Sequence, residues 1–167
     1  MLKATLRREQ IARDKPFLFE LFCHSRGQQF AHLPLPPEQK ESLFQQQFQA
    51  QDQSFTQNYT NPNARRMIVE IDGKSIGRLI THEQQDDLRI IDIALMPPWR
   101  DQGLGEKLLR DVLAEAKSAG KQVSLSVEAH NPAKRLYERL GFRLVEERPP
   151  YCLMVIPVSA HSQKSIP

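Results

Sequence analysis

Hydrophobic and polar residues alternate with two different periods along the chain, and their order predicts a domain of mixed strands and helices. Short apolar runs predict about seven strands, at residues 4–8, 67–71, 75–80, 88–96, 122–128, 142–146 and 151–155. Apolar residues at helical spacing predict about four helices, beginning near Asp14, near Pro37, at Leu104 and at Pro132. We therefore expect one α/β domain over residues 1–158 and a disordered tail over residues 159–167.

The first predicted helix has recognisable start and stop residues. Asp14 is expected to cap it, with Pro16 in its first turn, because a side-chain oxygen can accept a free amide hydrogen there. Gly27 is expected to end it. The second helix should turn an apolar face inward that includes Phe44 and Phe48.

Asp72-Gly73 is the clearest turn signal in the sequence. Met67–Ile71 precedes this pair and Ser75–Ile80 follows it, both with strand-like composition. An Asp-Gly pair suits a tight turn in which both central residues have positive φ, so the sequence predicts a β-hairpin here.

The stretch from Ile90 to Leu113 organises the chain around a strand, a tight loop and a helix. An apolar run ends at Pro97-Pro98, and helical spacing begins at Leu104. The loop between them contains Arg100 and two glycines. Free amide groups and the positive end of the helix dipole meet at such a helix start, so we expect an anion site there.

Three named phosphate-binding motifs can be compared with this loop. The dinucleotide motif G-x-G-x-x-G needs a third glycine where this chain has Leu108. The P-loop needs a Lys-Ser or Lys-Thr pair after its second glycine, and the sequence lacks one. The motif R-x-x-G-x-G is matched in full by Arg100–Gly105.

The composition and the net charge argue against a nucleic-acid, membrane or metal partner. Of 167 residues, 40% are hydrophobic and 26% are charged, and the net charge of +3 is too small to indicate a nucleic-acid partner. No apolar run is long enough to span a bilayer and no signal peptide is evident, so we expect a cytoplasmic protein without a membrane partner. Cys23 and Cys152 are interpreted as free thiols, and the histidines lack metal-ligand spacing, so no metal site is expected.

A second motif lies in the segment Asn131–Phe142. Together with the loop motif, this segment resembles the GNAT family of N-acetyltransferases, which bind acetyl-coenzyme A. The family positions are held by Asn131, Lys134, Leu136, Tyr137, Gly141 and Phe142. The departure is at Lys134, where the family has a small residue and this chain has its alanine one position earlier.

The resemblance implies a fold, a reaction and an acceptor class. The fold would be a central, twisted, mixed but mostly antiparallel sheet that splays open at the cofactor site. The reaction would be direct acetyl transfer from acetyl-coenzyme A to a primary amine of a small molecule or peptide. The alternative is a non-catalytic module that binds or senses acyl-coenzyme A. The resemblance also allows a homodimer.

The resemblance assigns cofactor contacts to the organising stretch. The main chain of Ile93, Ala94 and Leu95 would pair with the pantetheine arm, and an amide near Leu95 would polarise the thioester carbonyl. The pyrophosphate would be held by Arg100 and by the loop residues Asp101, Gln102, Gly103, Leu104, Gly105 and Glu106. Asn131 would contact the cofactor from a second side.

The resemblance places Tyr137 as the general acid that protonates the departing thiolate, whose pKa of about 8.5 is close to that of a phenol. Some family members have a carboxylate base five residues before the motif asparagine, where this chain has Ser126. A water relay and four side chains stay open as the base, namely Glu128, Asp92, Glu83 and His82.

The acceptor amine is left open by the sequence. Residues of the first two helices and the strand ends are candidates to line its site: His24, Arg26, His32, Phe48, Tyr59 and Tyr151. An acidic patch of Glu83, Asp86 and Asp87 would favour a cationic acceptor.

Overall fold

The computed structural model describes residues 3–59 and 62–158. In this part of the chain seven strands and four α-helices are joined by two short 3-10 helices. The strands are β1 (Thr5–Arg8), β2 (Ala64–Ile71), β3 (Lys74–Glu83), β4 (Asp87–Leu95), β5 (Gln122–Glu128), β6 (Arg143–Arg148) and β7 (Tyr151–Ile156). The helices are α1 (Ile11–His24), η1 (Arg26–Phe30), α2 (Pro37–Asn58), η2 (Pro97–Trp99), α3 (Leu104–Ser118) and α4 (Ala133–Leu140).

The strands hydrogen-bond in the order β1-β2-β3-β4-β5-β7-β6. β4 pairs with β5 in parallel, whereas β1 with β2, β5 with β7, and β6 with β7 pair antiparallel. This confirms the expected mixed, mostly antiparallel sheet with four helices. The predicted tail at 159–167 lies outside the described residues.

The contacts group the chain into two compact units. The first unit contains residues 1–80 and 93–102, and the second contains residues 81–92 and 103–167. Each is described below by itself. The prediction of a single domain over residues 1–158 stays a prediction.

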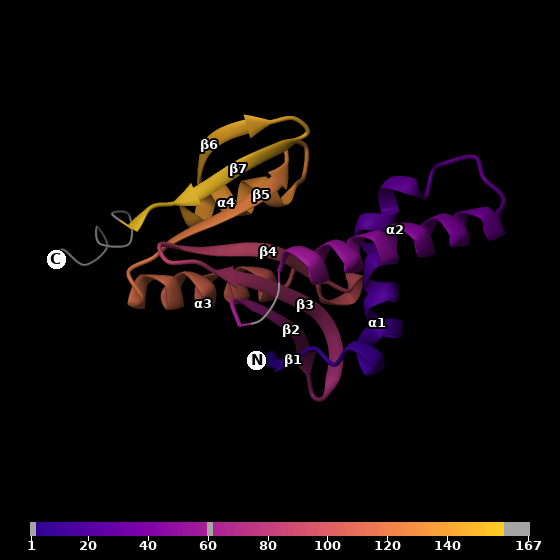
Figure 1. Ribbon diagram of the computed structural model, residues 1–167, viewed down its shortest axis with the longest axis horizontal. Helices are drawn as coiled ribbons and strands as arrows, with labels where there is room; N and C mark the ends of the chain where they lie inside the picture. Colours follow the sequence, from indigo (N-terminus) through magenta and orange to yellow (C-terminus); the bar gives the residue numbers. More distant parts are fainter. Residues whose placement is uncertain (1–2, 60–61, 159–167) are drawn as a thin grey trace. The chain divides into compact units, whose positions relative to one another are not determined.

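The first unit has an apolar core between its helices and its strands. Leu21 and Phe22 of α1 pack with Phe48 of α2 and with Ile68 of β2. The rings of Phe19 and Phe48 meet edge to face with centroids 5.4 Å apart. Figure 1 shows α1 and α2 as the two indigo-to-purple helices of this unit. Phe48 is therefore a core residue, and the suggestion that it lines an acceptor site is wrong.

α1 begins three residues earlier than Asp14, so the predicted cap at that residue is wrong. The N-cap is Gln10, and Asp14 lies in the first turn. Its Oδ2 accepts the Gln10 amide hydrogen at 2.7 Å, so the carboxylate still satisfies a free donor from within the helix. At the other end α1 stops at His24, and Gly27 lies inside η1 rather than at the helix end.

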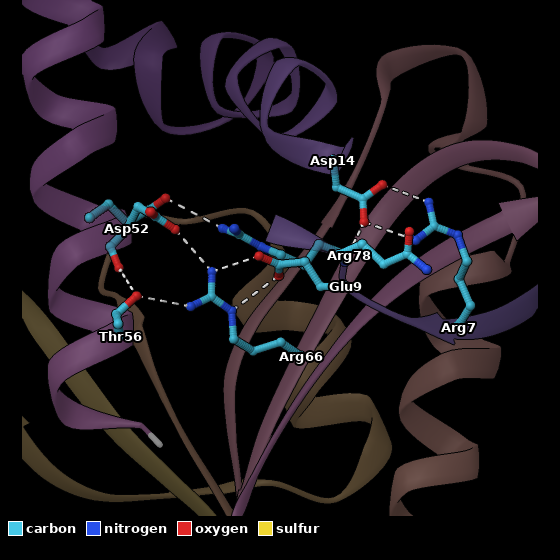
Figure 2. Close-up of polar contacts among 9 residues, drawn as sticks. Arg7, Glu9, Asp14, Asp52, Thr56, Arg66 and Arg78 are labelled. Carbon is cyan, nitrogen blue, oxygen red and sulfur yellow. Dashed lines mark hydrogen bonds and ion pairs between the residues drawn. The ribbon is translucent and has the colours of Figure 1, made fainter. Parts of the chain in front are cut away.

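Two groups of ion pairs connect the helices of the first unit to β1 and β2 (Figure 2). Arg7 of β1 donates two hydrogen bonds to the buried Asp14, at 2.7 and 2.9 Å, and also contacts Glu70. Arg66 of β2 pairs with Glu9 at 2.8 Å and with Asp52 of α2 at 2.9 Å. These pairs fix the start of α1 and the C-terminal half of α2 relative to the same pair of strands.

The predicted hairpin between β2 and β3 is confirmed. Asp72 and Gly73 have φ values of 50° and 76°, as a tight turn with two positive φ angles requires. The hairpin places Ile68 of β2 and Ile76 of β3 in the first unit, and both side chains are fully buried.

The second unit is arranged around β5. This strand pairs with β4 on one side and with β7 on the other, and β6 completes the edge. Figure 1 shows β6 and β7 in orange to yellow as the hairpin that follows α4. The predicted apolar face of α3 is buried at Leu104, Leu108, Leu109, Val112 and Ala116.

Candidate functional site

The carboxyl end of β4 is held tightly against β3 in the first unit. A Cβ atom added to Gly77 would lie 2.4 Å from the carbonyl oxygen of Ala94, so only glycine allows this approach. Met96 donates its amide hydrogen to Ile76 at 2.8 Å. The main chain of Ile93–Leu95, predicted to bind pantetheine, is therefore fixed by its neighbour strand.

Arg100 bonds to main-chain carbonyl groups. Its Nε donates to the Leu95 oxygen at 2.8 Å, and an Nη donates to the His24 oxygen at 2.8 Å. The side chain thus joins the end of β4 to the end of α1, a role that the motif did not indicate. The predicted phosphate contact of Arg100 stays a prediction.

The loop after Arg100 contains two residues with left-handed backbone. In the first unit Asp101 has φ of 58°, and the side chain of Gln102 donates to the Pro98 carbonyl. In the second unit Gly103 has φ of 81° and is the N-cap of α3. A Cβ at Gly103 would meet nothing within 4 Å, so it is the backbone conformation that makes glycine favourable there.

The start of α3 presents main-chain donors. The hydrogen bond from Lys107 to Gly103, 3.0 Å long, is the first of the helical pattern. The amides of Leu104, Gly105 and Glu106 precede it, so they have no partner within the helix. The Glu106 side chain pairs with Arg139 of α4 at 3.1 Å. This arrangement fits an anion such as a pyrophosphate, which the positive end of the helix dipole would also favour.

The pairing between β4 and β5 is short. It joins Asp87–Ile90 to Gln122–Leu125, and both strands continue beyond these pairs. From Val123 to Glu128 the other edge of β5 pairs with β7. The sheet is therefore open after Ile90, as predicted for a strand that exposes its main chain to a ligand.

Asn131 caps α4, as predicted. Its Oδ1 accepts the Ala133 amide hydrogen at 2.9 Å, and Pro132 already has helical φ and ψ. Gly141, with φ of 108°, ends the helix. The cap uses Oδ1, so the Nδ2 group is the part of Asn131 that remains relevant to the predicted cofactor contact.

Tyr137 lies on the inner side of α4. Its side chain is buried, and its ring packs edge to face on Phe142 with centroids 5.8 Å apart. Burial, together with the negative charge of Asp92, raises the pKa of the Tyr137 phenol to about 12. The hydroxyl carries its proton at neutral pH, as an ordinary phenol does, and the raised pKa makes it a weaker acid than a free phenol.

The candidate bases differ in their surroundings. Glu83 forms an ion pair with Lys121 at 2.7 Å, which occupies its carboxylate. The negative charge of Asp92 contributes, after burial, to the raised pKa of Tyr137. Glu128 lies two residues after Ser126 on β5, so the two share a face of the sheet. Among the carboxylates, Glu128 is the one placed beside the family's base position.

The candidate acceptor residues lie in several places. In the first unit a groove of about 320 Å³ is lined by Arg26 of η1 together with Phe22, Gln29, Phe30, Gln47, Ala50, Gln51, Ser54 and Phe55. Tyr59 lines a separate hollow of about 250 Å³. His24 and His32 are exposed. In the second unit Tyr151 of β7 lies opposite Glu128 of β5 in the antiparallel strand pairing.

Sequence reasoning missed Arg89. This half-buried residue of β4 hydrogen-bonds to Ser124 and Ser126 of β5. The alternation of side chains along a strand could have indicated it, because Arg89 stands between the buried Leu88 and Ile90 and therefore on the opposite face of the sheet.

The described residues contain neither a group of metal-ligand side chains nor a helix suited to cross a membrane. Across 3–59 and 62–158 no group of three or more His, Cys, Asp or Glu side chains could hold a metal ion. Within the same ranges no helix is long and apolar enough to cross a bilayer.

A family model described as the acetyltransferase (GNAT) family matches residues 28–142. The chain belongs to this family. The match includes both motifs, so the resemblance inferred from Arg100–Gly105 and Asn131–Phe142 is confirmed. The roles of single residues are not decided by it.

Two curated relatives resemble this GNAT protein over about half of its length. A Bacillus subtilis protein, provisionally named a ribosomal protein bS18-alanine N-acetyltransferase, is 35% identical over 50% of this chain and 56% of its own. The Haemophilus influenzae ribosomal protein bS18-alanine N-acetyltransferase is 34% identical over 46% of this chain and 53% of its own. This chain thus spans little more than half the length of the relatives it matches.

Solved structures share the fold over most of the chain. The PaiA N-acetyltransferase of Thermoplasma acidophilum, in complex with coenzyme A, has a TM-score of 0.71 and 18% identity over 93% of this chain and 99% of its own. The ribosomal-protein-S18-alanine N-acetyltransferase of Escherichia coli has a TM-score of 0.66 and 21% identity over 93% and 94% of the two chains. At this identity the likeness establishes the GNAT fold.

Proposed function

We propose that this GNAT protein transfers the acetyl group of acetyl-coenzyme A to the N-terminal amine of a peptide or protein. The observation that carries the proposal is the full R-x-x-G-x-G loop, in which left-handed Gly103 leads into the free amides of α3. The peptide acceptor is supported by the names of the two curated relatives, which describe acetylation of an alanine of a ribosomal protein.

Main-chain groups do most of the cofactor binding in this proposal. The amides of Asp101–Glu106 bind the pyrophosphate, supported by Arg100, and the main chain of Ile93–Leu95 binds the pantetheine arm. Asn131 makes a further contact. The close approach of Gly77 to Ala94 supports the second assignment, because it keeps the β4 main chain in one position.

Tyr137 supplies the proton for the leaving group. The acceptor amine attacks the thioester carbonyl, the carbon–sulfur bond breaks, and the departing sulfur takes the phenol proton. Tyr137 is protonated at neutral pH, and because its pKa of about 12 lies above the reference value of about 8.5 for a thiol, the proton is transferred uphill as the carbon–sulfur bond breaks. The proton that the attacking amine loses goes to Glu128 or to water.

An alternative function is a module that senses acyl-coenzyme A without turnover. The observation that favours it is Ser126, which occupies the position of the family's carboxylate base. Both functions require the same loop, so cofactor binding alone does not separate them.

Product formation separates the two functions. The protein is incubated with acetyl-coenzyme A and a peptide that begins with alanine, and both free thiol and peptide mass are followed. Equal amounts of thiol and of peptide heavier by one acetyl group are expected. Binding of acetyl-coenzyme A without any acetylated peptide would contradict catalysis and favour the sensing module.

A further inference from the structure

A charged array lies on one face of the sheet in the second unit. Arg89 donates to the Ser126 hydroxyl oxygen at 2.7 Å and to the Ser124 hydroxyl oxygen at 3.3 Å. Ser124, which is 4% exposed, donates in turn to a carboxylate oxygen of Asp87 at 2.6 Å. Four residues from β4 and β5 are thereby held in one orientation.

The direction of the hydrogen bonds follows from the guanidinium, which can only donate. Ser124 accepts a hydrogen bond from Arg89 and donates one to Asp87. Ser126 also accepts from Arg89, so its own proton points elsewhere, and the residue is exposed. The Asp87 carboxylate lies at the buried end of the array, so its exposed end offers the Arg89 guanidinium and a hydroxyl donor.

Ser126 connects this array to the position that the family resemblance assigns to a carboxylate base. Ser126 occupies the position five residues before Asn131, at which some members have a carboxylate. A carboxylate attracts a cationic amine, whereas Arg89 and Ser126 attract an anion. At this position the present chain therefore has a hydroxyl next to a guanidinium in place of a carboxylate.

We propose that Arg89 and Ser126 bind a carboxylate that the acceptor carries close to its amine. The proposal rests on the proposed acetyl transfer. Charge-assisted donors of this kind bind carboxylates more strongly than neutral donors do.

The position of Glu128 agrees with such an acceptor. Two residues along a strand are separated by about 7 Å, so Glu128 lies close to Ser126 on the same face. The carboxylate of Glu128 attracts the acceptor's amine, and the Arg89 array attracts its acid group. The acid group is either the side chain of the second residue of a peptide or the α-carboxylate of a free amino acid.

Matched acceptors test the proposal and distinguish these two sources. Turnover is compared for the amides of Ala-Glu and Ala-Gln, which differ by one charge, and for alanine and alaninamide. A carboxylate bound by Arg89 should raise kcat/KM by about ten-fold or more within a pair. A higher rate with Ala-Glu amide than with Ala-Gln amide identifies a side-chain carboxylate. A higher rate with alanine than with alaninamide identifies an α-carboxylate.

The variant Arg89→Gln should abolish that preference, and Arg89→Lys should restore part of it. Arg143→Gln removes an exposed arginine of β6 and is the matched control, for which the preference should not change. Equal rates within both pairs in the unmodified protein would overturn the proposal, as would a preference that survives in Arg89→Gln.

A binding measurement decides the result if none of the four acceptors is acetylated. The Arg89 side-chain resonance, assigned from Arg89→Lys, is followed by nitrogen-15 NMR in the presence of coenzyme A. It should shift with Ala-Glu amide or alanine and not with the neutral partner. No difference within either pair overturns the carboxylate site. Failure to bind acetyl-coenzyme A would instead overturn the proposed function.

Discussion

Tyr137 is the side chain to which this account assigns the most chemistry. It is 8% exposed, and its ring rests on Phe142. Leu136 and Leu140 are apolar residues of the same helix, so the sequence spacing would be the same if Tyr137 were only a core residue without a catalytic role. Its raised pKa, caused by burial and by Asp92, keeps the phenol protonated at neutral pH and also makes it a weaker acid toward a thiolate than a free phenol.

The variant Tyr137→Phe tests the acid role. Removing the hydroxyl should lower kcat by about a hundred-fold or more, since general acids contribute at least that much. The ring stays in place, so acetyl-coenzyme A affinity and the melting temperature should change little. Unchanged kcat in steady-state assays would remove Tyr137 from the mechanism.

The pKa of Tyr137 gives a second prediction. Burial and, to a smaller extent, the negative charge of Asp92 raise it, so Asp92→Asn should lower it part of the way from about 12 towards its ordinary value of 10.0. Tyrosinate absorbance is followed against pH in a background with Tyr59→Phe and Tyr151→Phe. Asp111→Asn, at an exposed position of α3, is the control that should leave the pKa unchanged. An equal pKa in Asp92→Asn would contradict the assigned electrostatic cause.

The sign of the accompanying stability change follows from the same shift. Between pH 10 and about 12 the folded protein retains the phenol proton that the unfolded chain releases. Its contribution to stability is complete below pH 10 and declines as the pH rises through this window. Tyr137→Phe should lack this part of the alkaline loss.

Side-chain partners were harder to predict than residue positions. The cap formed by Asn131 could be predicted, because it depends on neighbours two positions apart. The contact of Arg100 with the His24 carbonyl joins residues 76 positions apart, and a local pattern contains no such information. The same applies to Arg89 and Ser126, which are 37 positions apart.

The start of α1 shows how an element depends on such long-range partners. A short polar side chain before an apolar face suggested a cap at Asp14. The helix starts at Ile11, because Asp14 can satisfy the Gln10 amide while it pairs with Arg7. By contrast, the ends of β5 and the turn at Asp72-Gly73 are decided by local chemistry and were predicted correctly.

The variant Asp14→Asn tests this ion pair. It should lower the free energy of unfolding by about 2 kcal/mol at pH 7, because it removes the charge that Arg7 contacts. Arg7 holds the pKa of the Asp14 carboxyl below its usual 3.8. The difference should therefore be complete above pH 3.8 and shrink as the pH falls below it.

Urea denaturation at pH 7 and at low pH measures this effect. Glu38→Gln, in the first turn of α2, is the control that also removes a carboxylate near a helix start. A loss from Asp14→Asn no larger than that of the control at pH 7 would show that the pair contributes little.

Gly77 tests how the end of β4 is held. In Gly77→Ala the added Cβ would lie 2.4 Å from Ala94 and 2.7 Å from a Leu95 methyl carbon, so β4 must move. We expect a loss of about 1–3 kcal/mol in unfolding free energy and weaker acetyl-coenzyme A binding. Gly120→Ala, at φ of 67° with open space, should cost about 1 kcal/mol without changing affinity. Unchanged affinity in Gly77→Ala would contradict the assigned role of the β4 main chain.

At the scale of the whole molecule, the order of strands and helices was predictable from the alternation of polar and apolar residues. The two motifs then identified the family, because both lie at connections whose glycines and capping residues are local signals. The acceptor was not predictable. Its remaining candidate residues come from α1, η1, β7 and the connecting loops, and their surroundings depend on tertiary contacts.

Thermal unfolding with acetyl-coenzyme A, ATP and NAD, each in a separate sample, tests the central claim most directly. A ligand at about a hundred times its Kd adds about 2.7 kcal/mol to stability, which for a chain of this size is a shift of about 5–10 °C. We predict that shift with acetyl-coenzyme A and none with ATP or NAD. No shift with acetyl-coenzyme A would mean that the loop from Arg100 to Gly105 is only a structural turn.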